Sequence, residues 1–149
     1  MSEYVQILLD VSDDITHWVC RGLNSNEDWI GKHITYGFAL DGKMLGGLIF
    51  NDVRRNHDVW WTIYSDDKRW CNRHVLRTMF AAAFVDIGCR RINVLVETDN
   101  LNSINLVERL GFKREGLLRK YSENGHDCYI YGMLKQECPW LEKKGTKNE

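Results

Sequence analysis

Residues 96–116 read VETDNLNSINLVERLGFKREG, a pattern typical of a strand end, a short helix and the start of another strand. Asn100, Asn102 and Ser103 are of the residue types whose side-chain oxygens cap the first turn of a helix. Gly111 is of the type that ends a helix in the left-handed conformation. We therefore predict a helix over about 101–110, lying between two strands.

The chain before this stretch shows the same alternation of strand and helix. Residues 92–96 (INVLV) are almost all apolar, as expected of a strand at the centre of a sheet, and residues 59–64 (VWWTIY) are strongly β-prone. Between them, apolar residues of 75–84 follow helical spacing, and Gly88 follows as a stop. Because such a unit needs a right-handed crossover, strands 59–64 and 92–96 should lie parallel.

The remaining elements are short and close together. Strands are predicted at 5–9, 33–40, 45–51, 112–119 and 127–134, with a tight hairpin turn at Asp41-Gly42. Apolar residues of 15–23 predict a helix, and residues 24–27 are a loop or the start of a short second helix. The fold class is therefore α+β. A mixed, mostly antiparallel sheet of six to seven strands and about four helices should form one domain over 1–149.

Charge and composition exclude several classes of protein. The 149 residues carry 20 Lys and Arg against 21 Asp and Glu, a balance untypical of a general nucleic-acid binder. No run approaches the roughly 20 apolar residues that span a bilayer, and Met1-Ser2-Glu3-Tyr4 is unlike a secretory signal. Five scattered cysteines fit reduced thiols. We expect a cytoplasmic protein without membrane or nucleic-acid partners, and no local pattern predicts a metal site.

The turn after Tyr64 is the first candidate site. A strand ends there and a helix begins near 70–73, so unpaired N–H groups and the positive end of a helix dipole should face one place. Lys68, Arg69 and Arg73 add positive charge to it. The alternative is an ordinary strand-to-helix turn with solvated basic residues. No glycine-rich phosphate-binding motif is present.

The 96–116 stretch resembles the GNAT superfamily of N-acetyltransferases. Its Asn-x-x-Ser and Leu-Gly-Phe-x-x-Glu-Gly patterns are most similar to the branch that acetylates the N-termini of ribosomal proteins. The small, Trp-rich chain with Arg69-Trp70 also resembles bacteriophage-carried acetyltransferases, which would place it in a host cytoplasm. The resemblance implies an α/β/α layering in which strands 59–64 and 92–96 splay apart.

The resemblance also implies that acetyl-CoA is the cofactor-like substrate and that it lies in this splay. Its pantetheine arm would pair with the backbone of Ile63 and Tyr64. Its thiol end would be lined by Asn100, Asn102 and Ser103. Its pyrophosphate would sit on the backbone amides of six successive residues, namely Arg69, Trp70, Cys71, Asn72, Arg73 and His74.

Two departures from the family pattern concern this site. Residues 67–72 (DKRWCN) contain no glycine where the family's pyrophosphate loop has several, so close backbone approach to a phosphate is less assured. Many members also have a Tyr as general acid four residues before the Gly-Phe pair, and here that position is Val107. That role is therefore not carried over.

Acetyl transfer to an amine needs an oxyanion donor, a group that stabilises the departing thiolate, and a base. We predict a backbone N–H at Ile63–Tyr64 as the donor. We predict the Ser103 hydroxyl as the partner of the sulfur, although Ser103 also suits a helix cap. Glu97 is the candidate base. Alternatively Glu97 is a solvated strand-end carboxylate, and a water chain or His57, His74 or His126 takes the proton.

A covalent intermediate on Cys71 is disfavoured because no His–Asp partner set accompanies it. The predicted reaction is thus direct transfer to a primary amine, with a protein N-terminus or lysine favoured and a small amine possible. The alternative is a catalytically weak protein that binds acyl-CoA or a protein partner as an effector. A monomer or homodimer is expected.

Overall fold

The computed structural model describes residues 4–142, so most of the Met1–Tyr4 start discussed above lies outside the described residues. The seven strands are β1 (Gln6–Leu9), β2 (His33–Leu40), β3 (Lys43–Arg54), β4 (Asp58–Ser65), β5 (Arg91–Glu97), β6 (Lys113–Leu118) and β7 (Cys128–Leu134). The three α-helices are α1 (Asp14–Gly22), α2 (Arg73–Ala81) and α3 (Leu101–Leu110). A π-helical turn, Ala82–Asp86, extends α2, and 3-10 turns lie at Lys68–Trp70 and Lys135–Glu137.

All seven strands form one sheet in the order β1-β2-β3-β4-β5-β7-β6. The β4–β5 pair is parallel and every other pair is antiparallel. The predicted fold class, the parallel pair and the seven strands are therefore confirmed. The parallel pair forms because α2 carries the chain back across the sheet between β4 and β5.

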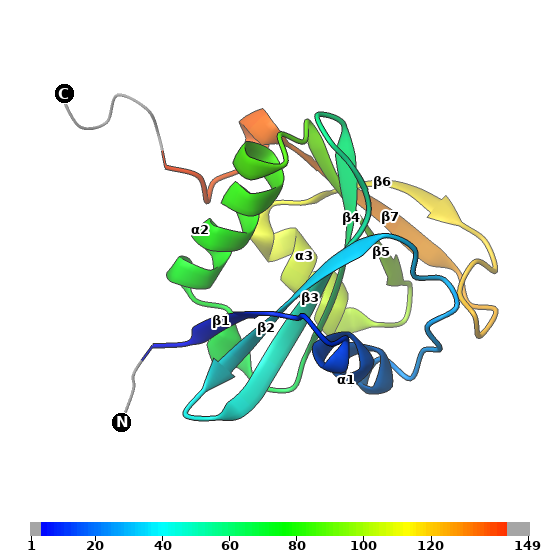
Figure 1. Ribbon diagram of the computed structural model, residues 1–149. Coiled ribbons are helices and arrows are strands. Elements are labelled where there is room, and N and C mark those ends of the chain that lie inside the picture. Colours follow the sequence, from blue (N-terminus) through cyan, green and yellow to red (C-terminus); the bar gives the residue numbers. More distant parts are fainter. Residues whose placement is uncertain (1–3, 143–149) are drawn as a thin grey trace.

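Helices cover both faces of the sheet (Figure 1). On one face, α2 and α3 bury the main core, in which Trp61, Phe80 and Ile92 are at most 3% exposed. On the other face, α1 packs Val19 and Cys20 onto Ile49 of β3. These two layers give the expected α/β/α arrangement, with the sheet in the middle.

Turn residues explain where the elements end. The predicted Asp41-Gly42 hairpin has both residues at positive φ, 51° and 82°, as the tight turn between twisted strands requires. Gly111 ends α3 at φ 112°. Asn24 at φ 55° interrupts helical geometry after α1, and residues 24–27 form a loop. Residues 4–142 consequently contain three α-helices where about four were expected.

Candidate active site

The parallel strands β4 and β5 separate along their length. Their pairing begins at Asp58 opposite Arg91 and ends at Trp61 opposite Val94. Beyond that point β4 stays paired with β3 as far as Ser65, and β5 stays paired with β7 as far as Glu97. In the described chain, residues 62–65 and 95–97 therefore have no strand neighbour on the sides that face each other. Unpaired backbone of this kind can bond an extended ligand as if it were another strand.

The side chains at the end of β4 are committed to packing. The Tyr64 ring lies edge-on to Trp18 of α1, with ring centroids 5.2 Å apart, and it fills the space where a Cβ at Gly22 would lie. Ile63 packs against the main core on the opposite face. The backbone of Ile63 and Tyr64 has no strand partner on the side toward β5, so it could bond a ligand.

The turn that follows β4 uses most of its own amides. The Arg69 N–H donates to the Asp67 carboxylate (3.0 Å), and the amides of 70, 71 and 72 donate to carbonyls within the turn. Asn72 caps α2 by accepting the Val75 N–H at 2.8 Å. Of the six amides predicted for a pyrophosphate, only those of Arg73 and His74 have no acceptor within the described residues. The amides that could bind an anion are therefore those in the first turn of α2.

Charge at this turn is reduced by a local ion pair. Arg69 contacts Asp67 at 2.7 Å, and hydrogen bonds from its side chain and backbone lower the pKa of Asp67 well below its usual value. Lys68 and Arg73 are exposed and form no ion pair in the part of the chain that the structure describes. Both are cations within the turn that could meet an anionic ligand.

Trp70 and Cys71 contribute to packing at the same turn. Trp70 is 4% exposed and stacks on Phe38, with ring centroids 5.4 Å apart, so its indole anchors the turn to the sheet. Burial raises the pKa of the Cys71 thiol, which keeps it protonated and weakly nucleophilic at neutral pH.

The first turn of α3 offers a different set of groups. Asn100 caps the helix by accepting the Ser103 N–H at 3.2 Å. The Ser103 hydroxyl is half-buried and has no hydrogen-bond partner among residues 4–142, while Asn102 is exposed. Val107 is 2% exposed and packs in the core. Ser103 is thus the side chain of this turn that is both sheltered and free to bond a ligand.

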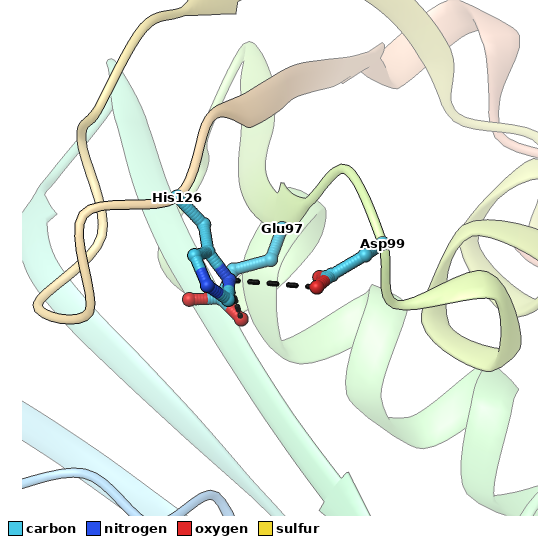
Figure 2. Close-up of side chains that lie close together, drawn as sticks. All are labelled: Glu97, Asp99 and His126. Atoms are coloured by element: carbon cyan, nitrogen blue, oxygen red, sulfur yellow. Dashed lines mark ion pairs between the residues drawn. The ribbon is translucent and has the colours of Figure 1, made fainter.

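Glu97, Asp99 and His126 come together at the end of β5 (Figure 2). The His126 Nδ1 lies 3.7 Å from a Glu97 oxygen and 3.5 Å from an Asp99 oxygen. One ligand atom from each residue falls within a group spanning 4.8 Å. Such spacing also suits a small cation, but exposed carboxylates often lie this close as simple ion pairs, and we assign no metal here.

This contact was missed in the sequence because His126 belongs to the loop between β6 and β7. Three histidines were equivalent candidates there, and only the fold separates them. His57 bonds Arg90 through Nδ1 (2.7 Å) beside the start of β4, at the opposite end of that strand from the separation. His74 is exposed in the first turn of α2. β7 pairs with β5 in a register that places Cys128 opposite Glu97, and this register brings the nearby His126 to Glu97.

A family model described as the acetyltransferase (GNAT) family matches residues 8–112. The chain belongs to the GNAT family of acetyltransferases. Among its relatives are two uncharacterized N-acetyltransferases, p20 of Bacillus licheniformis, 32% identical over 89 residues, and YoaA of Bacillus subtilis strain 168, 28% identical over 102 residues. These matches cover 58% and 62% of the chain but 45% and 56% of the relatives, so the chain spans about half the length of the curated relatives it matches.

Solved GNAT structures share the fold at low sequence identity. A spermidine N-acetyltransferase SpeG chimera from Vibrio cholerae and hSSAT superposes with a TM-score of 0.72 at 14% identity, covering 88% of this chain and 97% of that one. A dodecameric structure of the Vibrio cholerae spermidine N-acetyltransferase gives 0.70 at 13% identity, covering 91% and 96%. No helix among the described residues is long and apolar enough to cross a membrane.

Proposed function

We propose that this GNAT protein transfers the acetyl group of acetyl-CoA to a primary amine by direct attack in a ternary complex. The observation that carries the proposal is the separation of β4 from β5 after Trp61 and Val94. It leaves extended backbone free beside the first turn of α3. An extended amide-containing arm such as pantetheine can bond that backbone while its thioester reaches the helix turn.

The ends of such a donor match two further features. Its pyrophosphate would take the free amides of Arg73 and His74, with Lys68 and Arg73 supplying positive charge. Its sulfur would accept a hydrogen bond from the Ser103 hydroxyl. A backbone N–H at Ile63 or Tyr64 would donate to the carbonyl oxygen as it becomes an oxyanion. The amine nitrogen forms the new C–N bond, the C–S bond breaks, and the thiolate departs.

The acceptor that we favour is a protein N-terminus or a lysine, because the 96–116 pattern resembles the branch that acetylates ribosomal-protein N-termini. A small amine is the alternative, since solved structures of this fold include spermidine N-acetyltransferases. Glu97 is the proposed base, at the end of β5 beside the separation. The protein should act as a monomer or homodimer in the cytoplasm, which is the host cytoplasm if a phage encodes it.

A second candidate is an acyl-CoA-binding or protein-binding effector of the same fold. It is favoured by the anion turn (residues 67–74), where four of the six amides predicted to bind pyrophosphate already donate to other groups. It is also favoured by Val107, which offers no general acid. The two functions share the donor site and differ in turnover.

Two measurements separate these functions. Isothermal titration with acetyl-CoA should give saturable binding, and no heat at millimolar acetyl-CoA would contradict both. Thiol release should then be followed with a peptide bearing a free N-terminal serine, and separately with spermidine. Release above the acceptor-free rate supports the transferase, whereas binding without release supports the effector. Intact-mass analysis of lysate proteins, looking for an added acetyl group, identifies the acceptor.

A further inference from the structure

The cluster of Glu97, Asp99 and His126 joins three segments of the chain at the end of β5, where β5 is no longer paired with β4. Glu97 is the last residue of β5, Asp99 lies in the turn before α3, and His126 comes from the loop between β6 and β7. Figure 2 shows the imidazole lying against both carboxylates. The His126 and Glu97 side chains are 48% and 31% exposed, so both are open to an incoming acceptor.

The loop holds His126 in place through its own hydrogen bonds. The Ser122 hydroxyl accepts the His126 N–H at 2.9 Å, and the His126 carbonyl accepts the Ser122 N–H at 3.1 Å. The Asp127 carbonyl accepts the Thr98 N–H at 3.0 Å, which ties the loop to the residue between Glu97 and Asp99. The backbone of His126 is thus fixed relative to both carboxylates. A rigid support of this kind is what a proton-transfer group requires.

The atoms of the ring have distinct surroundings. Nδ1 is the nitrogen that faces Glu97 and Asp99. In a neutral ring, a nitrogen facing carboxylates carries the hydrogen, and the other nitrogen is free to accept one. Nε2 is therefore the position that can take a proton from outside the cluster.

We propose that His126 accepts the proton of the acceptor ammonium, with Glu97 and Asp99 stabilising the imidazolium that forms. This inference rests on the proposed function and changes the assignment of the base within it. The ammonium N–H bond breaks and its proton passes to Nε2. The freed lone pair then forms the C–N bond, the C–S bond breaks, and the second proton lost by nitrogen passes to the thiolate. The imidazolium finally returns its proton to water.

The charged groups around His126 fit this role. Glu97 faces it from β5, Asp99 from the following turn, and Asp127 is next to it in its own loop. Glu123, in the same loop, is directed instead toward Ser25 and the backbone of Asn26. Arg119 and Lys120, also in this loop, lie beside Asp127, whose carboxylate accepts the Lys120 N–H at 2.8 Å. The two groups that contact His126 itself are both carboxylates, which attract a cationic acceptor.

The test compares kcat/KM across pH 5–10 for the wild type and His126→Asn, using the N-terminal serine peptide or spermidine, whichever the wild type acetylates. Asn keeps a hydrogen-bond donor near the position of Nδ1 but cannot titrate. At pH 6.5 the variant should lose about 100-fold or more. The loss should shrink above about pH 8 for the peptide, because an α-amino group is then already largely neutral. The control is His33→Asn, since His33 also faces a carboxylate, Asp13 at 3.3 Å, and no change is expected.

Each outcome decides the matter. If His126→Asn lowers kcat/KM by the same factor at every pH, His126 has a structural role, and if kcat/KM does not change, His126 has no role in the reaction. Either result would overturn the inference while the proposed function stands. No wild-type release would overturn both. Activity that falls with EDTA and returns with zinc would make the cluster a metal site and also overturn the proton role. If His126→Asn fails to fold, the double variant Glu97→Gln, Asp99→Asn must show the same pH-dependent deficit.

Discussion

Asn72 and Asn100 occupy equivalent places, as caps of α2 and α3. Each uses its side-chain oxygen to accept the backbone N–H three residues further on, that of Val75 or Ser103. A side chain used in this way is held in place by its cap, with one of the two lone pairs on its oxygen already occupied. The Ser103 hydroxyl has no hydrogen-bond partner among residues 4–142. This distinguishes Ser103 from Asn100, although both are of a helix-capping type in the sequence.

Replacing Ser103 by Ala tests the free hydroxyl. A hydrogen bond to a charged group is worth about 1.5–3 kcal/mol, so kcat should fall about 10- to 100-fold if the hydroxyl stabilises the departing thiolate. The binding of acetyl-CoA by calorimetry should change much less. Ser12→Ala is the control, because the Ser12 hydroxyl bonds Asp14 beside α1. Full turnover by Ser103→Ala would remove this residue from the chemistry.

A double substitution tests the two unpaired cations of the anion turn, Lys68 and Arg73. Each exposed ion pair contributes about 0.2–1 kcal/mol, so Lys68→Ala with Arg73→Ala should raise the KM for acetyl-CoA by between about twofold and 30-fold. Added salt should reduce the difference in this KM between the double variant and the wild type. Arg69→Ala is the matched control, since Asp67 already neutralises that guanidinium. An equal rise in KM for Arg69→Ala would show that the pair opens to bind the ligand.

At the scale of elements, α1 determines where the end of β4 lies. Gly22, the last residue of α1, leaves room for the Tyr64 ring, and a Cβ there would overlap three ring atoms. The close approach of helix to strand therefore depends on a missing side chain. It also connects α1 to the backbone that we assign to the oxyanion.

Gly22→Ala should consequently impair activity more than stability. Ala favours a helix by about 1 kcal/mol over Gly, which offsets part of the steric cost, while the displaced ring shifts the Ile63–Tyr64 backbone. We expect a fall in kcat of at least about tenfold, measured beside the thermal unfolding midpoint. Gly116→Ala is the control, because a Cβ at Gly116 meets no atom within 4 Å. Equal kcat values in the two variants would contradict this role of α1.

The elements themselves could be predicted because their signals are local. Continuous apolar residues in β5, the Asp41-Gly42 turn and the Gly111 stop each act within a few residues, and β4 and β5 followed as a parallel pair from the intervening helix. The contact between His126 and Glu97 could not be predicted, since it depends on the path of a nine-residue loop, 119–127, with no periodic pattern. The hydrogen bonds inside the anion turn could not be predicted from the sequence either, because they depend on the backbone angles of Asp67.

At the scale of the whole molecule, a ladder of polar groups joins strands at the end of the sheet away from the candidate site. Asp58 accepts hydrogen bonds from Arg54 (2.7 Å) and from Asn93 (2.9 Å), and Arg91 continues the ladder to Glu115 at 2.7 Å. Burial alone would raise the pKa of Asp58, but the bonds from Arg54 and Asn93 lower it. Because the folded-state pKa is depressed, Asp58 stabilises the fold above its unfolded value, near 3.8, and this contribution is lost as pH falls below it.

Urea unfolding should show this loss. The free energy of unfolding of the wild type should decrease from pH 7 to pH 3, and Asp58→Asn should show a smaller decrease because its amide does not titrate. Asp28→Asn, whose carboxylate lies in the exposed 24–29 loop, is the control and should follow the wild type. The same pH slope for Asp58→Asn and the wild type would place the acid sensitivity elsewhere, for example at Asp10, whose pKa is also lowered.

The four residue pairs from Asp58–Arg91 to Trp61–Val94 divide the sheet into two halves of unequal chemistry. The β1–β4 half carries α1, the oxyanion backbone and the start of the anion turn. The β5–β7 half carries Glu97, His126 and the turn with Ser103. The groups proposed for the donor and for the acceptor therefore lie on opposite sides of the β4–β5 separation. One hydrophobic core continues beneath both halves, because Trp61 of β4 packs against Phe80 of α2 and against Phe112, just before β6. The groups on the two sides of the separation are therefore positioned by the same packed side chains.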